Sequence, residues 1–134
     1  MFRLAVPLIV ALAAAPLAAQ EPTVVILARH AEKAAQPVND PPLTAAGEAR
    51  ARALAAELAD AHLDAIVTTQ FARTRLTAAP LAEAQHLTPA IVATSGTALA
   101  HARAVADTIR ARYTGRTVLV VGHSNTIPKI IPAL

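Results

Sequence analysis

Two histidines follow segments that are apolar and rich in β-branched residues. Residues 23–28 (TVVILA) lead into Arg29 and His30, and residues 117–121 (TVLVV) lead through Gly122 into His123. A neutral imidazole can attack phosphorus through one ring nitrogen while the other donates to a carbonyl. A cationic imidazole can instead bind a phosphoryl oxygen. This pair of histidines is therefore a candidate for phosphoryl-transfer chemistry.

Two arginines are placed to assist such chemistry. Arg29 directly precedes His30, and Arg73 falls in the first turn of a predicted helix. Guanidinium groups can hold phosphoryl oxygens bidentately and offset the charge that develops during transfer. The helix N-terminus near Arg73 adds partial positive charge. Arg75 is interpreted as a solvated charge. This chemistry requires no metal and no cofactor.

The elements that must position these residues follow from the hydrophobic pattern. Short apolar segments alternate with longer segments of helical period, which predicts an α/β domain with a mostly parallel central sheet and helices on both faces, a three-layer sandwich. Because parallel strands end at one edge of the sheet, both histidines and both arginines should converge there. The predicted strands are 23–28, 64–68, 90–93 and 117–121; the predicted helices are 44–60, 71–85 and 97–113.

Finer expectations concern the helices. Thr44 should cap the first helix, and Pro80 should bend or restart the second. His62, His86 and His101 are interpreted as surface residues. In the third helix, helical spacing predicts an inner face made of Leu99, Ala102, Val105, Ala106 and Ile109.

Composition excludes several classes of protein. The net charge is only +3 and aromatic residues make up 2% of the chain, so a nucleic-acid partner is not expected. Cysteine is absent, which excludes a disulfide or a thiolate nucleophile. Neither HExxH nor a glycine-rich nucleotide motif occurs. The expected partner is a small phosphorylated substrate.

The first twenty residues have the layout of a secretory signal peptide. Arg3 precedes an apolar run that extends to about Leu17, and small residues follow at Ala18 and Ala19. We therefore expect a signal peptide over 1–20, a mature domain over 21–134 and a periplasmic or secreted location, without membrane association after cleavage. The alternative is an uncleaved anchor, but Pro7 and Pro16 interrupt a run that is short for a membrane span.

The sequence resembles the histidine phosphatase superfamily, also called the phosphoglycerate mutase-like family. The resemblance implies His30 as the nucleophile, and Arg29, Arg73 and His123 as the residues that line the phosphate pocket. It extends over residues 23–127 and rests on motifs that occur in the family's order: LARHAEK at 27–33, with Ala31 where glycine is usual; LTAAG at 43–47; FARTRLTA at 71–78; and VVGHSN at 120–125.

The sequence departs from the family in its proton donor. One branch places an acid after the third strand, but residues 94–106 contain none; the other places aspartate after the second histidine, where this chain has Ser124. The chain also ends eleven residues after His123, short of the further elements usual in relatives. Glu32 and Asp40 are the candidate donors. Without an efficient acid, hydrolysis should depend strongly on the leaving group.

Phosphomonoester hydrolysis through a phosphohistidine is therefore the predicted function. Two alternatives remain from other classes. One is a catalytically degenerate module that still binds phosphate, and the other is a small envelope scaffold whose motifs are relics. The sequence contains no element that specifies the substrate or the oligomeric state.

Overall fold

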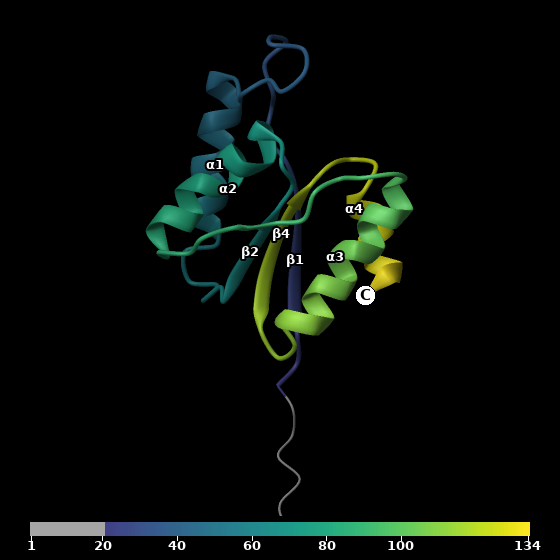
Figure 1. Ribbon diagram of the computed structural model, residues 1–134. Helices are drawn as coiled ribbons and strands as arrows, with labels where there is room; N and C mark the ends of the chain where they lie inside the picture. The colour runs from purple at the N-terminus through teal and green to yellow at the C-terminus, as the bar shows by residue number, and fades with distance from the viewer. Residues whose placement is uncertain (1–20) are drawn as a thin grey trace, which may run out of the picture.

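The computed structural model describes residues 21–134 (Figure 1). The predicted signal peptide, 1–20, lies outside the described residues. Strands and helices alternate as the sequence predicts. The elements are β1 (Val24–Arg29), α1 (Ala45–Glu57), β2 (Ala65–Thr68), α2 (Ala72–Ala84), β3 (Ala90–Ile91), α3 (Ala98–Arg112), β4 (Thr117–Gly122), α4 (Ile127–Ile130) and a closing 3₁₀ turn (Ile131–Ala133).

The four strands form one parallel sheet in the order β1-β4-β2-β3. The central strand, β4, pairs with β1 and β2, and its last residue, Gly122, lies opposite Arg29. The register thus brings the residues that follow β1 and β4 to the same edge. Figure 1 shows the strands running in one direction toward the edge where the loops after β1 and β4 emerge.

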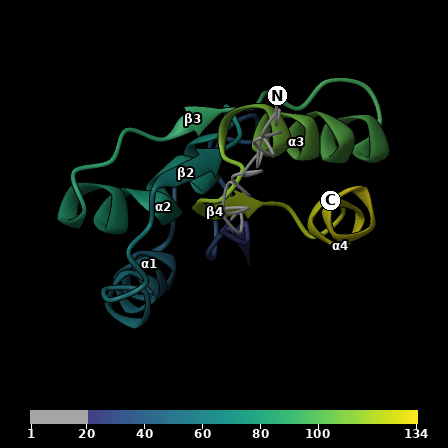
Figure 2. The same cartoon turned by 90° about the horizontal axis from the view of Figure 1, so that it is seen from below.

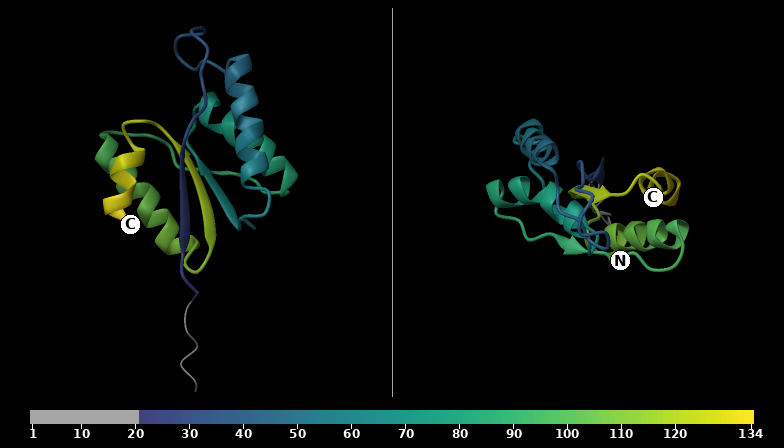
Figure 3. Two further views of the ribbon diagram at one scale, coloured as in Figure 1. Left: turned by 180° about the vertical axis from the view of Figure 1, so that it is seen from behind. Right: turned by 90° about the horizontal axis from the view of Figure 1, so that it is seen from above.

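Helices cover both faces of the sheet, which confirms the predicted three-layer sandwich. Alternate residues of β4 point to opposite sides. Val118 and Val120 pack with α3 and α4, whereas Leu119 and Val121 pack with α2 and the end of α1. The view along the sheet shows α1 and α2 on one side and α3 and α4 on the other (Figures 2 and 3). The two cores are aliphatic, as the low aromatic content requires.

Three expectations about the helices need correction. Helix α2 does not restart at Pro80 but continues through it, because the buried residues around the proline hold it against the sheet and offset the lost hydrogen bond. Leu99 is 45% exposed. His101, expected at the surface, is instead buried with 4% exposure, because it lies at helical spacing from Val105 and Ile109 on the inner face. His62 and His86 are exposed as predicted.

Thr44 caps α1 as predicted, accepting a hydrogen bond from the Gly47 amide. Pro128 lies in the first turn of α4, where a proline costs no hydrogen bond. Within residues 21–134, no helix has the length and apolar character that crossing a membrane requires.

Candidate active site at the carboxyl edge of the sheet

His30 is held rigidly at the end of β1. Its backbone amide donates to the Gly122 carbonyl at 2.9 Å, and its side chain is buried. The ring Nδ1 donates to the Ala31 carbonyl at 2.7 Å. This hydrogen bond fixes the proton on Nδ1 and leaves the lone pair on Nε2. Burial lowers the pKa of His30, and Arg73 and Arg29 lower it further against the opposing effect of the Ala31 carbonyl. The ring is therefore a neutral base at pH 7.

The backbone after His30 is fixed by helix α2. The amide of Ala31 donates to Thr77 Oγ1 at 2.9 Å, and that hydroxyl donates to the Arg73 carbonyl at 2.7 Å. The Ala31 methyl group is itself buried in a small cluster with Leu43 and Ala51. Alanine therefore fits at the position where glycine is usual in the family.

Helix α1 buttresses the same loop from the other side. The carbonyl of Glu32 accepts hydrogen bonds from the Thr44 amide at 2.8 Å and from the Thr44 hydroxyl at 3.3 Å. A Cβ at Gly47 would lie 2.2 Å from that carbonyl oxygen. Gly47 thus allows the helix to approach the loop that carries His30 closely.

His123 lies beside His30, with ring centroids 5.4 Å apart. Its Nε2 is 3.1 Å from the Thr69 hydroxyl, which in turn bonds to Thr74 at 2.9 Å. Burial, together with the charges of Arg73, His30 and His101, lowers the pKa of His123 to about 4. Gly122 leaves room for the following turn, since a Cβ there would lie 3.0 Å from Ile127 Cδ1.

The two predicted arginines take different positions. Arg73 stacks over the Phe71 ring, with its guanidinium carbon 4.3 Å from the ring centroid, and it lines a cavity beside His123. Its buried Nε has no hydrogen-bond partner among the described residues. Arg29 is exposed at the end of β1, but its charge lowers the pKa of His30. Arg75 is exposed.

The two predicted proton donors lie outside this cavity and have other partners. Glu32 is exposed and forms an ion pair with Arg50 at 2.8 Å, which lowers the pKa of its carboxyl. Asp40 accepts a hydrogen bond from the Ala72 amide at 2.8 Å and so caps α2, whose own N-cap residue provides no side-chain bond.

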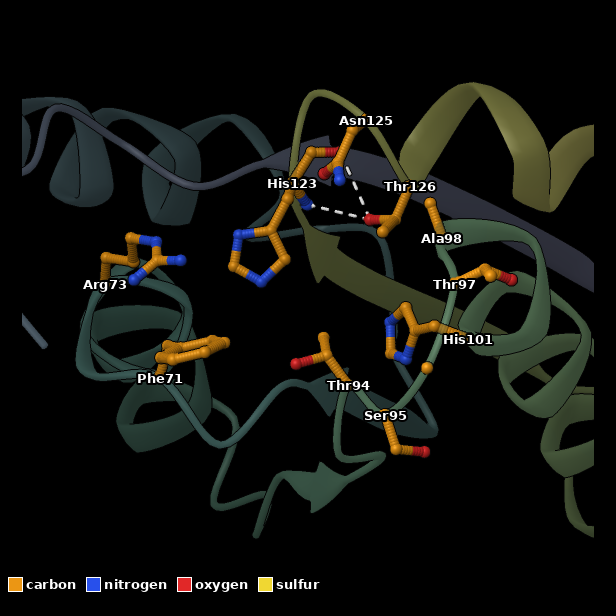
Figure 4. A pocket seen from close by; sticks show the side chains of 11 residues that line it. Phe71, Arg73, Thr94, Ser95, Thr97, Ala98, His101, His123, Asn125 and Thr126 are labelled. Carbon is orange, nitrogen blue, oxygen red and sulfur yellow. Dashed lines mark hydrogen bonds between the residues drawn. The ribbon is translucent and has the colours of Figure 1, made fainter. Parts of the chain in front are cut away.

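The cavity has a volume of about 240 Å³ and lies between the sheet edge and the start of α3 (Figure 4). Sequence analysis identified two of its polar residues, Arg73 and His123, and missed the others. His101 was detectable from its spacing with Val105 and Ile109. The loop residues had no such signal. The lining consists of Phe71, Arg73, residues 94–98, His101, His123, Asn125 and Thr126.

The arrangement combines a neutral buried imidazole with a free lone pair, a second imidazole and a guanidinium at one edge. Such a site can attack an electrophile that carries negative charge and can bind the oxygens of that electrophile. Within the described part of the chain, no group of three or more histidine, aspartate or glutamate side chains could hold a metal ion.

Comparison with known proteins is consistent with this chemistry. The family model of the histidine phosphatase superfamily (branch 1) matches residues 25–95. Phosphoserine phosphatase 1 of Hydrogenobacter thermophilus is 44% identical over 68 residues, which are 46% of this chain and 32% of that protein. The match therefore spans about a third of the relative's length.

Solved structures share the fold. A protein from Agrobacterium tumefaciens, provisionally assigned as the phosphohistidine phosphatase SixA, has a TM-score of 0.64 and 28% identity, covering 84% of this chain and 76% of that one. A protein from Nakamurella multipartitia carries the same provisional assignment. Its structure has a TM-score of 0.58 and 32% identity, covering 79% of this chain and 62% of that one.

Proposed function

Because this chain belongs to the histidine phosphatase superfamily, we propose that it hydrolyses phosphomonoesters through a phosphohistidine formed on His30. One observation carries the proposal. The hydrogen bond from Nδ1 to the Ala31 carbonyl, 2.7 Å long, leaves Nε2 unprotonated at the end of β1. A buried imidazole held in this tautomer is ready to act as a nucleophile.

The neighbouring residues suit the binding of a phosphoryl group. Arg73 offers a planar fork of donors whose direction is set by stacking on Phe71. Arg29 adds charge from the end of β1, and His123 contributes an imidazole held by Thr69. Together these groups would offset the negative charge that repels a nucleophile from a phosphate ester. A water molecule then hydrolyses the phosphohistidine and restores His30.

The relatives suggest the class of substrate. The curated relative is a phosphoserine phosphatase, and two structural neighbours are provisionally assigned as phosphohistidine phosphatases. The cavity of about 240 Å³ beside Arg73 has room for a small leaving group. We therefore propose a small phosphorylated molecule as substrate, with O-phosphoserine as the first compound to assay.

Trapping the intermediate tests the proposal. The mature protein is mixed with ³²P-labelled phosphoramidate or a labelled aryl phosphate, quenched in alkali and digested. Label should appear in an acid-labile, alkali-stable form on the peptide that contains His30. His30→Ala should remove the label and reduce kcat/KM by about 10⁴-fold or more, as the loss of a nucleophile does.

The outcome also separates the alternatives. If the protein binds inorganic phosphate but hydrolyses no ester, the result would favour the degenerate phosphate-binding module. Absence of both binding and turnover would favour the scaffold. Label on a residue other than His30 would contradict the role of His30 as nucleophile, but the proposal that the protein is a phosphatase would still hold.

We propose export as a separate point, supported by the Arg3 start and the apolar run before residue 20. N-terminal sequencing of protein recovered from the cell envelope or medium should give a start near Glu21. Membrane-bound protein that retains Met1 would contradict it.

A further inference from the structure

One group in the cavity has no part in the function proposed so far. His101 is 4% exposed and its Nδ1 has no hydrogen-bond partner among the described residues. A buried polar group without a partner costs about 1–3 kcal/mol. Ring nitrogens at this depth normally have hydrogen-bond partners, and the Ala93 carbonyl is the one backbone acceptor that acts on this ring. The position therefore invites a role with a ligand.

The place of His101 relative to the nucleophile indicates that role. Figure 4 shows its ring at one side of the cavity, with His123 and Arg73 across from it. Arg73 and His123 line the cavity, whereas His30 does not. In phosphoryl transfer the nucleophile and the leaving group lie on opposite sides of the phosphorus. With the phosphoryl group held by Arg73 and His123, the leaving group extends into this cavity.

The cavity offers few groups that could protonate the leaving oxygen. Its lining includes no carboxylate, and its only titratable side chains are Arg73, His101 and His123. An arginine does not release its proton near neutral pH. His123 is bonded to Thr69 and faces His30, on the phosphate-binding side. Of these three side chains, only His101 combines a titratable imidazole with a position across the cavity from Arg73 and His123.

We propose, on the basis of the proposed function, that His101 is the proton donor to the leaving-group oxygen. The lone pair on His30 Nε2 forms a bond to phosphorus, and the bond from phosphorus to the bridging oxygen breaks. That oxygen keeps the electron pair and takes a proton from the His101 imidazolium, leaving as an alcohol. His101 becomes neutral and can then accept a proton from the water that attacks the phosphohistidine.

The electrostatics of the cavity allow this cycle. In the free enzyme burial lowers the pKa of His101, against the opposing effect of the Ala93 carbonyl, so the ring rests neutral. The charged and titratable groups that face it are Arg73 and His123. A phosphate ester dianion that binds to Arg73 offsets the positive charge and favours the imidazolium. Substrate binding thus raises the pKa of His101, opposite to the effect of burial, and supports its role as a donor.

The decisive measurement is the dependence of kcat/KM on the leaving group. Wild-type protein is assayed with a series from p-nitrophenyl phosphate to glycerol 2-phosphate. With His101 as donor the slope of log kcat/KM against leaving-group pKa is shallow. In His101→Asn the slope steepens, because the alkyl ester loses about 10²–10⁴-fold and the aryl ester less than about threefold. Replacing His86, an exposed histidine, by asparagine should change neither substrate.

A purely structural role gives a different pattern. If His101 only packs α3, His101→Asn lowers the melting temperature and reduces both substrates equally, which would overturn the proposal. A steep slope in wild-type protein would overturn it as well, even if the variant fails to fold. The wild-type ratio of alkyl to aryl kcat/KM should fall as pH rises, and the variant's ratio should not. The His101→Asn variant should still form phosphohistidine on His30 with the aryl ester. This measurement tests the proposed function separately from the role of His101.

Discussion

The two sides of the cavity differ in how firmly their side chains are held. On the side of the sheet edge, buried hydrogen bonds fix His30 to Ala31, Ala31 to Thr77 and His123 to Thr69. On the side of α3, the bonds between Gln70 and Thr94 are exposed, and His101 Nδ1 has no partner among the described residues. The backbone and the two histidines of the first side are fixed before substrate binds, whereas, within residues 21–134, unpaired donors remain on both sides, at Arg73 Nε and on His101.

This difference suits the chemistry of each side. The phosphoryl group is common to all phosphomonoesters, so the residues that attack and hold it benefit from rigid preorganisation. Leaving groups vary, so the residues that meet them need only a donor and space. The predictions below test this division, from the largest expected effect to the smallest.

The largest effect should come from the guanidinium on the rigid side. Arg73→Lys should reduce kcat/KM by about 10²–10³-fold, nearly as much as Arg73→Ala, because lysine keeps the charge but loses the fork. Arg75→Ala, on the exposed face of the same helix, should have little effect. Steady-state kinetics of the three variants decides the matter. Equal losses at positions 73 and 75 would show that Arg73 does not contact the substrate.

The second effect concerns His123 and pH. Its pKa is about 4 in the folded protein and about 6.5 when unfolded, so the unfolded state binds more protons between these values. Stability should be fully present above pH 6.5 and fall by roughly 3 kcal/mol as pH drops toward 4. Urea unfolding across this window measures the change. His123→Gln should reduce the loss of stability in this window and leave the part due to His30 and His101, whose pKa values burial also lowers. An unchanged pH profile would show that His123 does not cause the loss.

The third effect tests the close approach of α1 to the His30 loop. A methyl group at position 47 would overlap the Glu32 carbonyl oxygen, so Gly47→Ala should destabilise the protein by about 1–3 kcal/mol and also lower kcat. Gly115→Ala provides a control away from this contact and from the cavity, although its positive φ adds some strain of its own. The melting temperature and kcat should both fall in Gly47→Ala. Unchanged values would mean that the His30 loop can move away from α1 without cost.

The smallest effect compares one hydrogen bond from each side. Thr77→Val leaves the buried Ala31 amide unpaired and should cost about 1–3 kcal/mol, with a matching loss in kcat. Gln70→Ala removes exposed bonds to Thr94 and should cost less than about 0.5 kcal/mol. Denaturant unfolding of both variants checks the order. A larger loss at Gln70 would reverse the comparison drawn above.

The sequence by itself was sufficient to predict the element order, the parallel sheet and the edge at which His30, Arg73 and His123 meet. Strand and helix periodicities are local properties, and parallel strands necessarily share a carboxyl edge. For the same reason Thr44 was predictable as a cap and Arg75 as an exposed residue. The roles of His30, Arg29, Arg73 and His123 in catalysis remain predictions until the variants are measured.

Only the tertiary structure decided which polar groups share the cavity and which are otherwise engaged. Nothing local to Glu32 reveals that Arg50, eighteen residues away, pairs with it. Likewise, nothing near Asp40 in the sequence reveals that its carboxylate caps α2. The prediction placed His101 at the surface because of its residue type, although its spacing from Val105 and Ile109 indicates the inner face of α3. Only the packing of α3 shows that the ring lines the cavity. Contacts between distant residues form through packing of whole elements, and local pattern does not encode those distances.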